Sequence, residues 1–180
     1  MNLESLTDLF LEEVRDLYDA EQQFMKAMPK VTEAVFSPEL KDAFLLHMEQ
    51  TKGQLERLEQ IFKTYKLPAK GKRCRAMEGL LEEAGELLQK ERGSDPSVLD
   101  AALIMAAQKI EHYEIAGYGC ARAFARTLGA EEAERLLQQT LDEEAETDRK
   151  LTLLAETTIN LDAAESDAEL LEEAESESSK

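Results

Sequence analysis

The sequence has little of what β proteins, zinc sites and disulfide scaffolds need. Four prolines and eight glycines among 180 residues are few for a β protein with many turns. Its two cysteines, Cys74 and Cys120, lie far apart and form no Cys-x-x-Cys pair. This spacing fits neither a zinc site nor a disulfide framework, and predicts reduced thiols in a cytoplasmic protein.

Long hydrophobic runs and positive charge are also scarce. No stretch of about 18 apolar residues is present, so we expect no membrane span. The first ten residues lack the basic segment of a signal peptide, and we expect none. The chain has 39 acidic and 21 basic residues, a net charge of −18. That charge argues against a nucleic-acid backbone or an anionic membrane as the partner, and it is compatible with attracting cations.

What the chain does contain favours long helices, because Ala, Glu and Leu dominate and apolar residues recur every three or four positions. Ser37-Pro38-Glu39 and Ser94-Asp95-Pro96 are typical helix starts. Pro29 is expected to kink the first helix or end its first part, with a continuation towards Val35. The predicted helices are Leu3–Met28, Pro38–Tyr65, Ala76–Glu91, Leu99–Leu128 and Glu131–Ile159.

Acidic residues interrupt the apolar stripes of three of these helices. Glu21 lies in the first stripe, Glu114 about 40° from the centre of the fourth, and Glu144 at the centre of the fifth. Asp148 is within about 40° of Glu144. A carboxylate in the seam of a helix bundle must be paired, protonated or bound to a cation.

The two halves of the chain repeat this pattern. Glu21 and Gln50 are 29 positions apart, and Glu114 and Glu144 are 30 apart. Two such helical hairpins predict an all-α four-helix bundle over residues 1–161, with the short third helix in the crossover. Residues 162–180 carry eight acids and one lysine, which predicts a solvated acidic tail.

In such a bundle Glu21, Glu114, Glu144 and Asp148 come from three helices, with His47 on the fourth. Hard oxygen ligands, an imidazole and a high negative charge suit a dinuclear iron or manganese centre. For Glu21 a boundary position with its carboxylate in solvent is an equal alternative, and His47 is more often a hydrogen-bonded core residue. Two residues near Glu114 in the sequence are not included among these predicted ligands. Glu111 is about 100° off the stripe, either a bridging acid or a surface residue, and His112 points outward.

Several segments resemble a known family, above all Glu111-His112-Tyr113-Glu114 within 108–119. Segments 47–57, 76–84 and 141–148 share the likeness, which is to the YciF-like stress proteins, a ferritin-like family also called DUF892. The resemblance covers about residues 3–160 and implies a ferritin-like bundle, a homodimer and a link to bacterial stress. It also implies a set of metal ligands: Glu21, Glu114, Glu144 and Asp148, with His47 nearby.

One position departs from the family pattern. The family has Glu in His-x-x-Glu-Thr where this chain has Gln50, a neutral and weaker ligand, so the first-half metal position is less complete. Two functions stay open. One is a di-iron-type stress protein with ferroxidase or peroxide-handling activity, and the other is a metal-free dimeric interaction module. A mini-ferritin storage cage is a weaker third, because the sequence has no cue for a closed shell.

Overall fold

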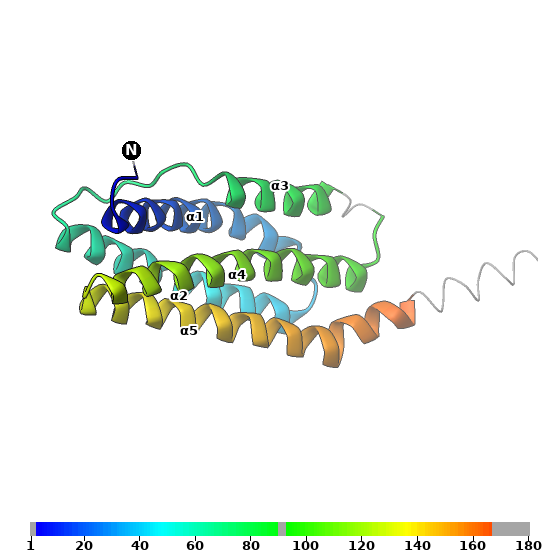
Figure 1. The fold of residues 1–180 in the computed structure, drawn as a ribbon. Coiled ribbons are helices and arrows are strands. Elements are labelled where there is room, and N and C mark those ends of the chain that lie inside the picture. Colours follow the sequence, from blue (N-terminus) through cyan, green and yellow to red (C-terminus); the bar gives the residue numbers. More distant parts are fainter. Residues whose placement is uncertain (1–2, 90–92, 167–180) are drawn as a thin grey trace, which may run out of the picture.

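The computed structural model describes residues 3–89 and 93–166, and over these ranges it confirms the predicted all-α bundle (Figure 1). Residues 160–166 continue the last helix, so the first part of the predicted acidic tail is helical. The remainder of that tail, 167–180, lies outside the described residues. The helices are α1 Leu6–Ala34, α2 Pro38–Thr64, α3 Arg75–Gln89, α4 Pro96–Thr127, α5 Glu131–Leu154 and the π-helical segment η1 Ala155–Ile159.

The helix starts follow the predicted capping chemistry. Ser37 accepts a hydrogen bond from the backbone N–H of Leu40, and Asp95 accepts from Ser97 and Val98. The expectation that Pro29 could end the first helix is wrong, because α1 runs through it without interruption. A single proline removes one backbone hydrogen bond, and the burial of apolar residues on both sides of it outweighs that loss.

The four long helices close into a bundle. α1 packs against α2 and α4, and α5 packs against α2 and α4, so each helix has two long neighbours. The short α3 lies in the crossover between α2 and α4 and covers α1 and α4 (Figure 1). This is the predicted arrangement of two helical hairpins with a short helix in the connection.

The apolar core is divided into two clusters along the bundle. One cluster lies towards the α1–α2 connection and includes Phe24, Phe44 and Leu103. The other lies towards the α4–α5 connection and includes Phe10, Ile61 and Leu137. On each long helix, polar residues occupy the positions between the two clusters. The bundle therefore has a buried polar layer at mid-height.

No helix in residues 3–89 or 93–166 has both the length and the apolar character needed to cross a bilayer. Both cysteines are free thiols, with Cys74 buried and Cys120 exposed.

The loop of residues 69–74, which carries Lys70, Lys72 and Arg73, packs against α1. Lys72 donates its backbone N–H to the carbonyl of Arg15 at 3.0 Å, and its Nζ lies 2.7 Å from Glu12. The backbone N–H of Cys74 donates to Asp19 at 2.8 Å. These contacts hold the loop against α1 and bring Gly71 too close to Asp19 for a side chain.

Gly71→Ala is expected to destabilise the fold. A Cβ on Gly71 would lie 2.7 Å from Asp19 Cβ and 3.0 Å from Asp19 Cα, so backbone has to move. We expect a loss of about 1–3 kcal/mol in the free energy of unfolding, measured by urea denaturation. The matched control is Gly79→Ala in α3, where nothing lies within 4 Å of the added Cβ. Alanine should stabilise that helix by about 0.5–1 kcal/mol, and equal effects at both positions would contradict the close packing.

Candidate metal centre

The polar layer brings buried ionisable side chains from all four long helices to one level. Glu21 comes from α1, His47 from α2, Glu111 and Glu114 from α4, and Glu144 from α5. All five are buried between the two apolar clusters. Burying so many charges in an apolar core costs several kcal/mol each unless they are paired or protonated, or coordinate metal.

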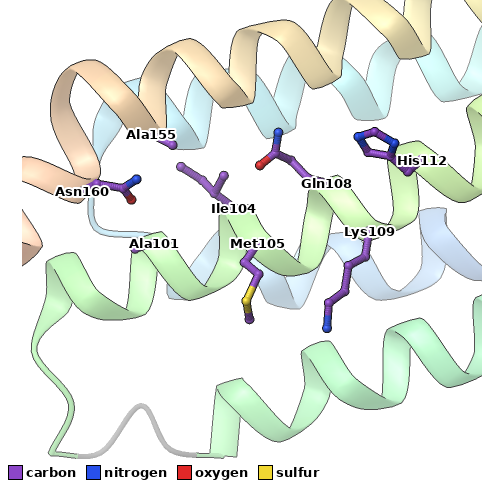
Figure 2. Close-up of a pocket in the computed structure, with 8 residues that line it drawn as sticks. All are labelled: Ala101, Ile104, Met105, Gln108, Lys109, His112, Ala155 and Asn160. Atoms are coloured by element: carbon purple, nitrogen blue, oxygen red, sulfur yellow. The ribbon is translucent and has the colours of Figure 1, made fainter.

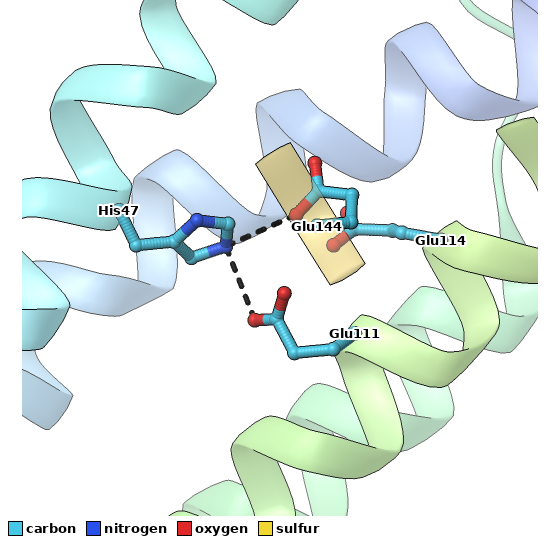
Figure 3. Close-up of side chains that lie close together, drawn as sticks. All are labelled: His47, Glu111, Glu114 and Glu144. Atoms are coloured by element: carbon cyan, nitrogen blue, oxygen red, sulfur yellow. Dashed lines mark ion pairs between the residues drawn. The ribbon is translucent and has the colours of Figure 1, made fainter. Parts of the chain in front are cut away.

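Four of these side chains converge on one point. One ligand atom each of His47, Glu111, Glu114 and Glu144 lies within 4.8 Å of the other three, and the side chains point towards one another (Figure 3). His47 Nε2 is 3.1 Å from a Glu111 oxygen and 3.7 Å from a Glu144 oxygen. These spacings leave room for a cation between them.

The hydrogen bonds around His47 indicate which ring nitrogen carries the proton and which one, without a proton, faces the carboxylates. The hydroxyl of Thr147 donates to the carbonyl of Glu143 at 3.1 Å, so its oxygen is left to accept from His47 Nδ1 at 3.4 Å. A neutral His47 with its proton on Nδ1 then directs the lone pair of Nε2 at the carboxylates. Lone pair and carboxylate repel unless a proton or a cation lies between them.

The buried atoms of this group lack hydrogen-bond partners. Among the described residues, neither carboxylate oxygen of Glu111, Glu114 or Glu144 has one, and the approach of His47 Nε2 to its neighbours does not have hydrogen-bond geometry. Buried polar atoms are almost always satisfied in folded proteins. Seven unsatisfied atoms on four converging side chains fit a group that binds there.

Glu21 is tied into the layer differently. Tyr118, fully buried on α4, donates its hydroxyl to Glu21 at 2.5 Å. This bond fixes the carboxylate of α1 beside the other acids and opposes the effect of burial on its pKa.

Burial raises the pKa of every acid in the layer. Burial is the largest cause throughout, raising the pKa of Glu21 to about 7 and that of Glu111 to about 8. The pKa values of Glu114 and Glu144 lie well above the usual range, because burial is reinforced by the neighbouring carboxylates. The layer therefore carries protons at neutral pH unless cations replace them.

The chemistry of this layer fits a divalent cation. Its ionised carboxylates carry enough negative charge to neutralise such an ion, and His47 adds a nitrogen ligand. Carboxylates and imidazole projecting inward from facing helices are the donors of di-iron and di-manganese bundles.

The structure brings together four of the six residues predicted for the site: Glu21, His47, Glu114 and Glu144. Asp148 is not a member of the buried group around His47. Gln50 is only partly buried. Asp148 accepts a hydrogen bond from Gln108 at 3.1 Å and lies 3.3 Å from His112 Nε2, because its position on α5 is rotated from Glu144 towards the outer edge of α4.

Glu111 belongs to the buried group, although the sequence left open whether it is a bridging acid or a surface residue. α4 packs against α1, α3 and α5, so its buried arc is wider than a single apolar stripe. The available signal was spacing, because Glu111 precedes Glu114 by three positions and shares its helix face.

The chain has known relatives. A family model described as a domain of unknown function, DUF892, matches residues 5–164. Protein YciF of Escherichia coli K12 is 44% identical over 161 residues, which cover 89% of this chain and 96% of YciF.

Solved structures share the fold. The crystal structure of the E. coli stress protein YciF superposes with a TM-score of 0.82, covering 87% of this chain and 98% of that one at 44% identity. YcfI of Rhodopseudomonas palustris, described as a candidate structural protein, gives a TM-score of 0.80 at 40% identity, covering 84% and 95%. A protein from Xanthomonas campestris pv. campestris gives 0.71 at 17% identity, covering 91% and 99%, which supports the fold alone.

Proposed function

We propose that this chain, which belongs to the DUF892 family, binds iron(II) or manganese(II) in its polar layer and acts as a metal-dependent redox protein in stress. The observation that carries the proposal is the set of buried, unsatisfied ligand atoms on His47, Glu111, Glu114 and Glu144. YciF is named a stress protein, and this chain is 44% identical to it, which supports a role in stress for this chain.

Each side chain has a defined part in this proposal. Glu111, Glu114 and Glu144 supply carboxylate oxygens, and His47 supplies Nε2 because Thr147 holds Nδ1. Tyr118 positions Glu21. The apolar clusters on either side exclude bulk water and strengthen each interaction with a cation. Iron or manganese bound here would supply one-electron chemistry towards oxygen or peroxide, of the ferroxidase or peroxide-consuming kind.

Dimer formation and a cytoplasmic location belong to the same proposal. Leu45 and Leu46 on α2 and Leu153 on α5 are large apolar side chains that stand about half or more exposed. When exposed apolar side chains form one contiguous patch, that patch is typical of association surfaces. Sedimentation equilibrium of the full chain would test the homodimer.

A metal-free interaction module is the second candidate. Gln50 replaces the family's glutamate and is only partly buried, and the relative YcfI is described as a candidate structural protein. In that case the acids of the layer stay protonated and the protein acts through its surface.

One experiment separates the two candidates. The protein is purified without oxygen, stripped with chelator, loaded with iron(II) or manganese(II), and analysed for bound metal. We expect at least about one ion per chain and a rise in melting temperature with metal concentration, because metal that binds only the folded state stabilises it.

The control is calcium, which prefers more oxygen ligands and longer bonds than this group offers. Fewer than about 0.1 ion per chain after loading, with an unchanged melting temperature, would reject the metal function and favour the module.

A further inference from the structure

Asp148 stands between the proposed centre and the surface. It lies one turn beyond Glu144 on α5, and its side chain is 21% exposed, whereas Glu144 is fully buried. Its carboxylate accepts from Gln108 Nε2 at 3.1 Å and lies 3.3 Å from His112 Nε2. Both partners sit on α4 beside Glu111, so the three residues span the α4–α5 seam next to the centre.

An open pocket of about 440 Å³ reaches this seam from outside. Gln108 and His112, the two partners of Asp148, line it together with Lys109, Ala155 and Asn160, and Asp148 itself is not among the lining residues. Lys109 is paired with Glu83 at 2.8 Å. Figure 2 shows Gln108 and His112 on the side of α4 that faces α5. The pocket borders η1, where the π-helical backbone begins at Ala155. Such local widening of a helix is frequent at functional sites.

The contacts of Asp148 are of a kind that can be exchanged. His112 is 68% exposed, so water can replace its interaction with the carboxylate. Gln108 also donates to Thr152 at 2.7 Å and keeps that partner if Asp148 turns away. On the inner side, Asp148 is near enough to Glu111 for its charge to act on that buried acid.

We propose that Asp148 is the entry ligand of the centre: a divalent cation that reaches the pocket lined by Gln108 and His112 binds Asp148 first and then passes to Glu111 and Glu144. This inference rests on the proposed metal function. The step transfers an ion between carboxylates and involves no change of oxidation state. Asp148 is thus a positioning residue for loading, outside the final ligand set.

The test is the rate of metal uptake by the full chain. The protein has four tyrosines and no tryptophan, and Tyr118 bonds directly to Glu21, so tyrosine fluorescence reports on the centre. Stripped protein is mixed with cobalt(II) in a stopped-flow instrument. Asp148→Asn should slow uptake by about tenfold at low salt, because a charge that steers the ion is lost. The melting-temperature rise at saturating cobalt should equal that of the unmodified protein.

Asp148→Asn is chosen because the amide can still bond Gln108, and circular dichroism of each metal-free variant checks the fold. Asp148→Glu should restore uptake to within about twofold. Asp142→Asn is the matched control, since it removes the same charge from an exposed position on α5. Its uptake rate should stay within about twofold of the unmodified protein.

Three results would overturn the entry role: an unchanged rate in Asp148→Asn, an equal slowing in Asp142→Asn, or loss of the final cobalt-induced shift in Asp148→Asn. The last would make Asp148 a ligand of the centre. If the unmodified protein takes up no cobalt, iron(II) or manganese(II), the proposed function fails and the entry role with it. If it takes up metal and Asp148→Asn does so equally fast, only the entry role fails.

Discussion

Glu144→Gln is expected to stabilise the metal-free protein at about pH 8 and to remove most of the stabilisation that metal provides. Burial and the neighbouring carboxylates hold the pKa of Glu144 well above the usual range, so its ionised form is costly. Glutamine has nearly the same volume and no charge, and its amide can donate to the acids that lack donors. We expect a gain of about 1–3 kcal/mol, or about 2–10 °C in melting temperature.

The same substitution removes a charged ligand. If metal affinity falls about 100-fold, the stabilisation at a fixed saturating metal concentration falls by about 2.7 kcal/mol. The measurement is a pair of thermal melts for each protein, one with chelator and one with manganese(II). A stabilised metal-free variant that no longer responds to manganese is the expected result.

The adjacent residue supplies a matched control. Glu143 forms a partly buried ion pair with Arg57, which also donates to Thr140 at 2.9 Å. Glu143→Gln should therefore destabilise the protein, with or without metal, because Arg57 loses its charge partner. If Glu144→Gln instead destabilises the metal-free protein as Glu143→Gln does, the acids of the layer serve the fold and the metal centre is refuted.

The sequence was sufficient for the fold because its local and global signals agree. Ser37 and Asp95 cap helices whose apolar stripes have the right period, and the spacing of the two halves predicts paired hairpins. Glu114 and Glu144 could be placed in the core because they lie in the apolar stripes of their helices, whereas Glu21 had an equal alternative at the boundary. The structure buries all three.

The site was less predictable, because membership in it depends on which neighbours surround each helix. Glu111 looked peripheral on a helical wheel, yet α4 has long neighbours on two sides and α3 on a third. Asp148 lies within about 40° of Glu144 on the helical wheel, yet its side chain is 21% exposed in the seam between α4 and α5. The proton position on His47 depends on Thr147, one hundred positions away in the sequence, and periodicity cannot reveal such a contact.

The stability of the metal-free protein should fall as the pH rises, and the stabilisation that metal provides should grow. The usual carboxyl pKa of 4.5 applies to the unfolded chain, whereas folding raises the pKa of Glu21 to about 7 and that of Glu111 to about 8. Between these limits the folded metal-free protein binds more protons than the unfolded chain. Its stability is therefore complete at low pH in this range and is lost as the pH rises towards 8.

Each extra proton bound by the folded state contributes a slope of about 1.4 kcal/mol per pH unit. The melting temperature with chelator should fall by about 3–6 °C per pH unit for each such proton between about pH 5.5 and 8. Metal needs the carboxylates ionised, so its affinity rises over the same range. The difference between melts with manganese(II) and with chelator should consequently widen as the pH increases.

Surface acids cannot produce this pattern. Ion pairs lower the pKa values of Glu12, Glu78 and Glu146, which leaves these groups ionised throughout the range. Glu13, outside the centre, has a pKa raised by burial and by Asp16, so a variant of the centre is the necessary control. Glu144→Gln should flatten the slope with chelator, because one acid and its repulsion are gone. A metal-free protein whose melting temperature rises from about pH 5.5 to 8 would mean that the buried acids are ionised and satisfied without metal, and the proposed centre would lose its physical basis.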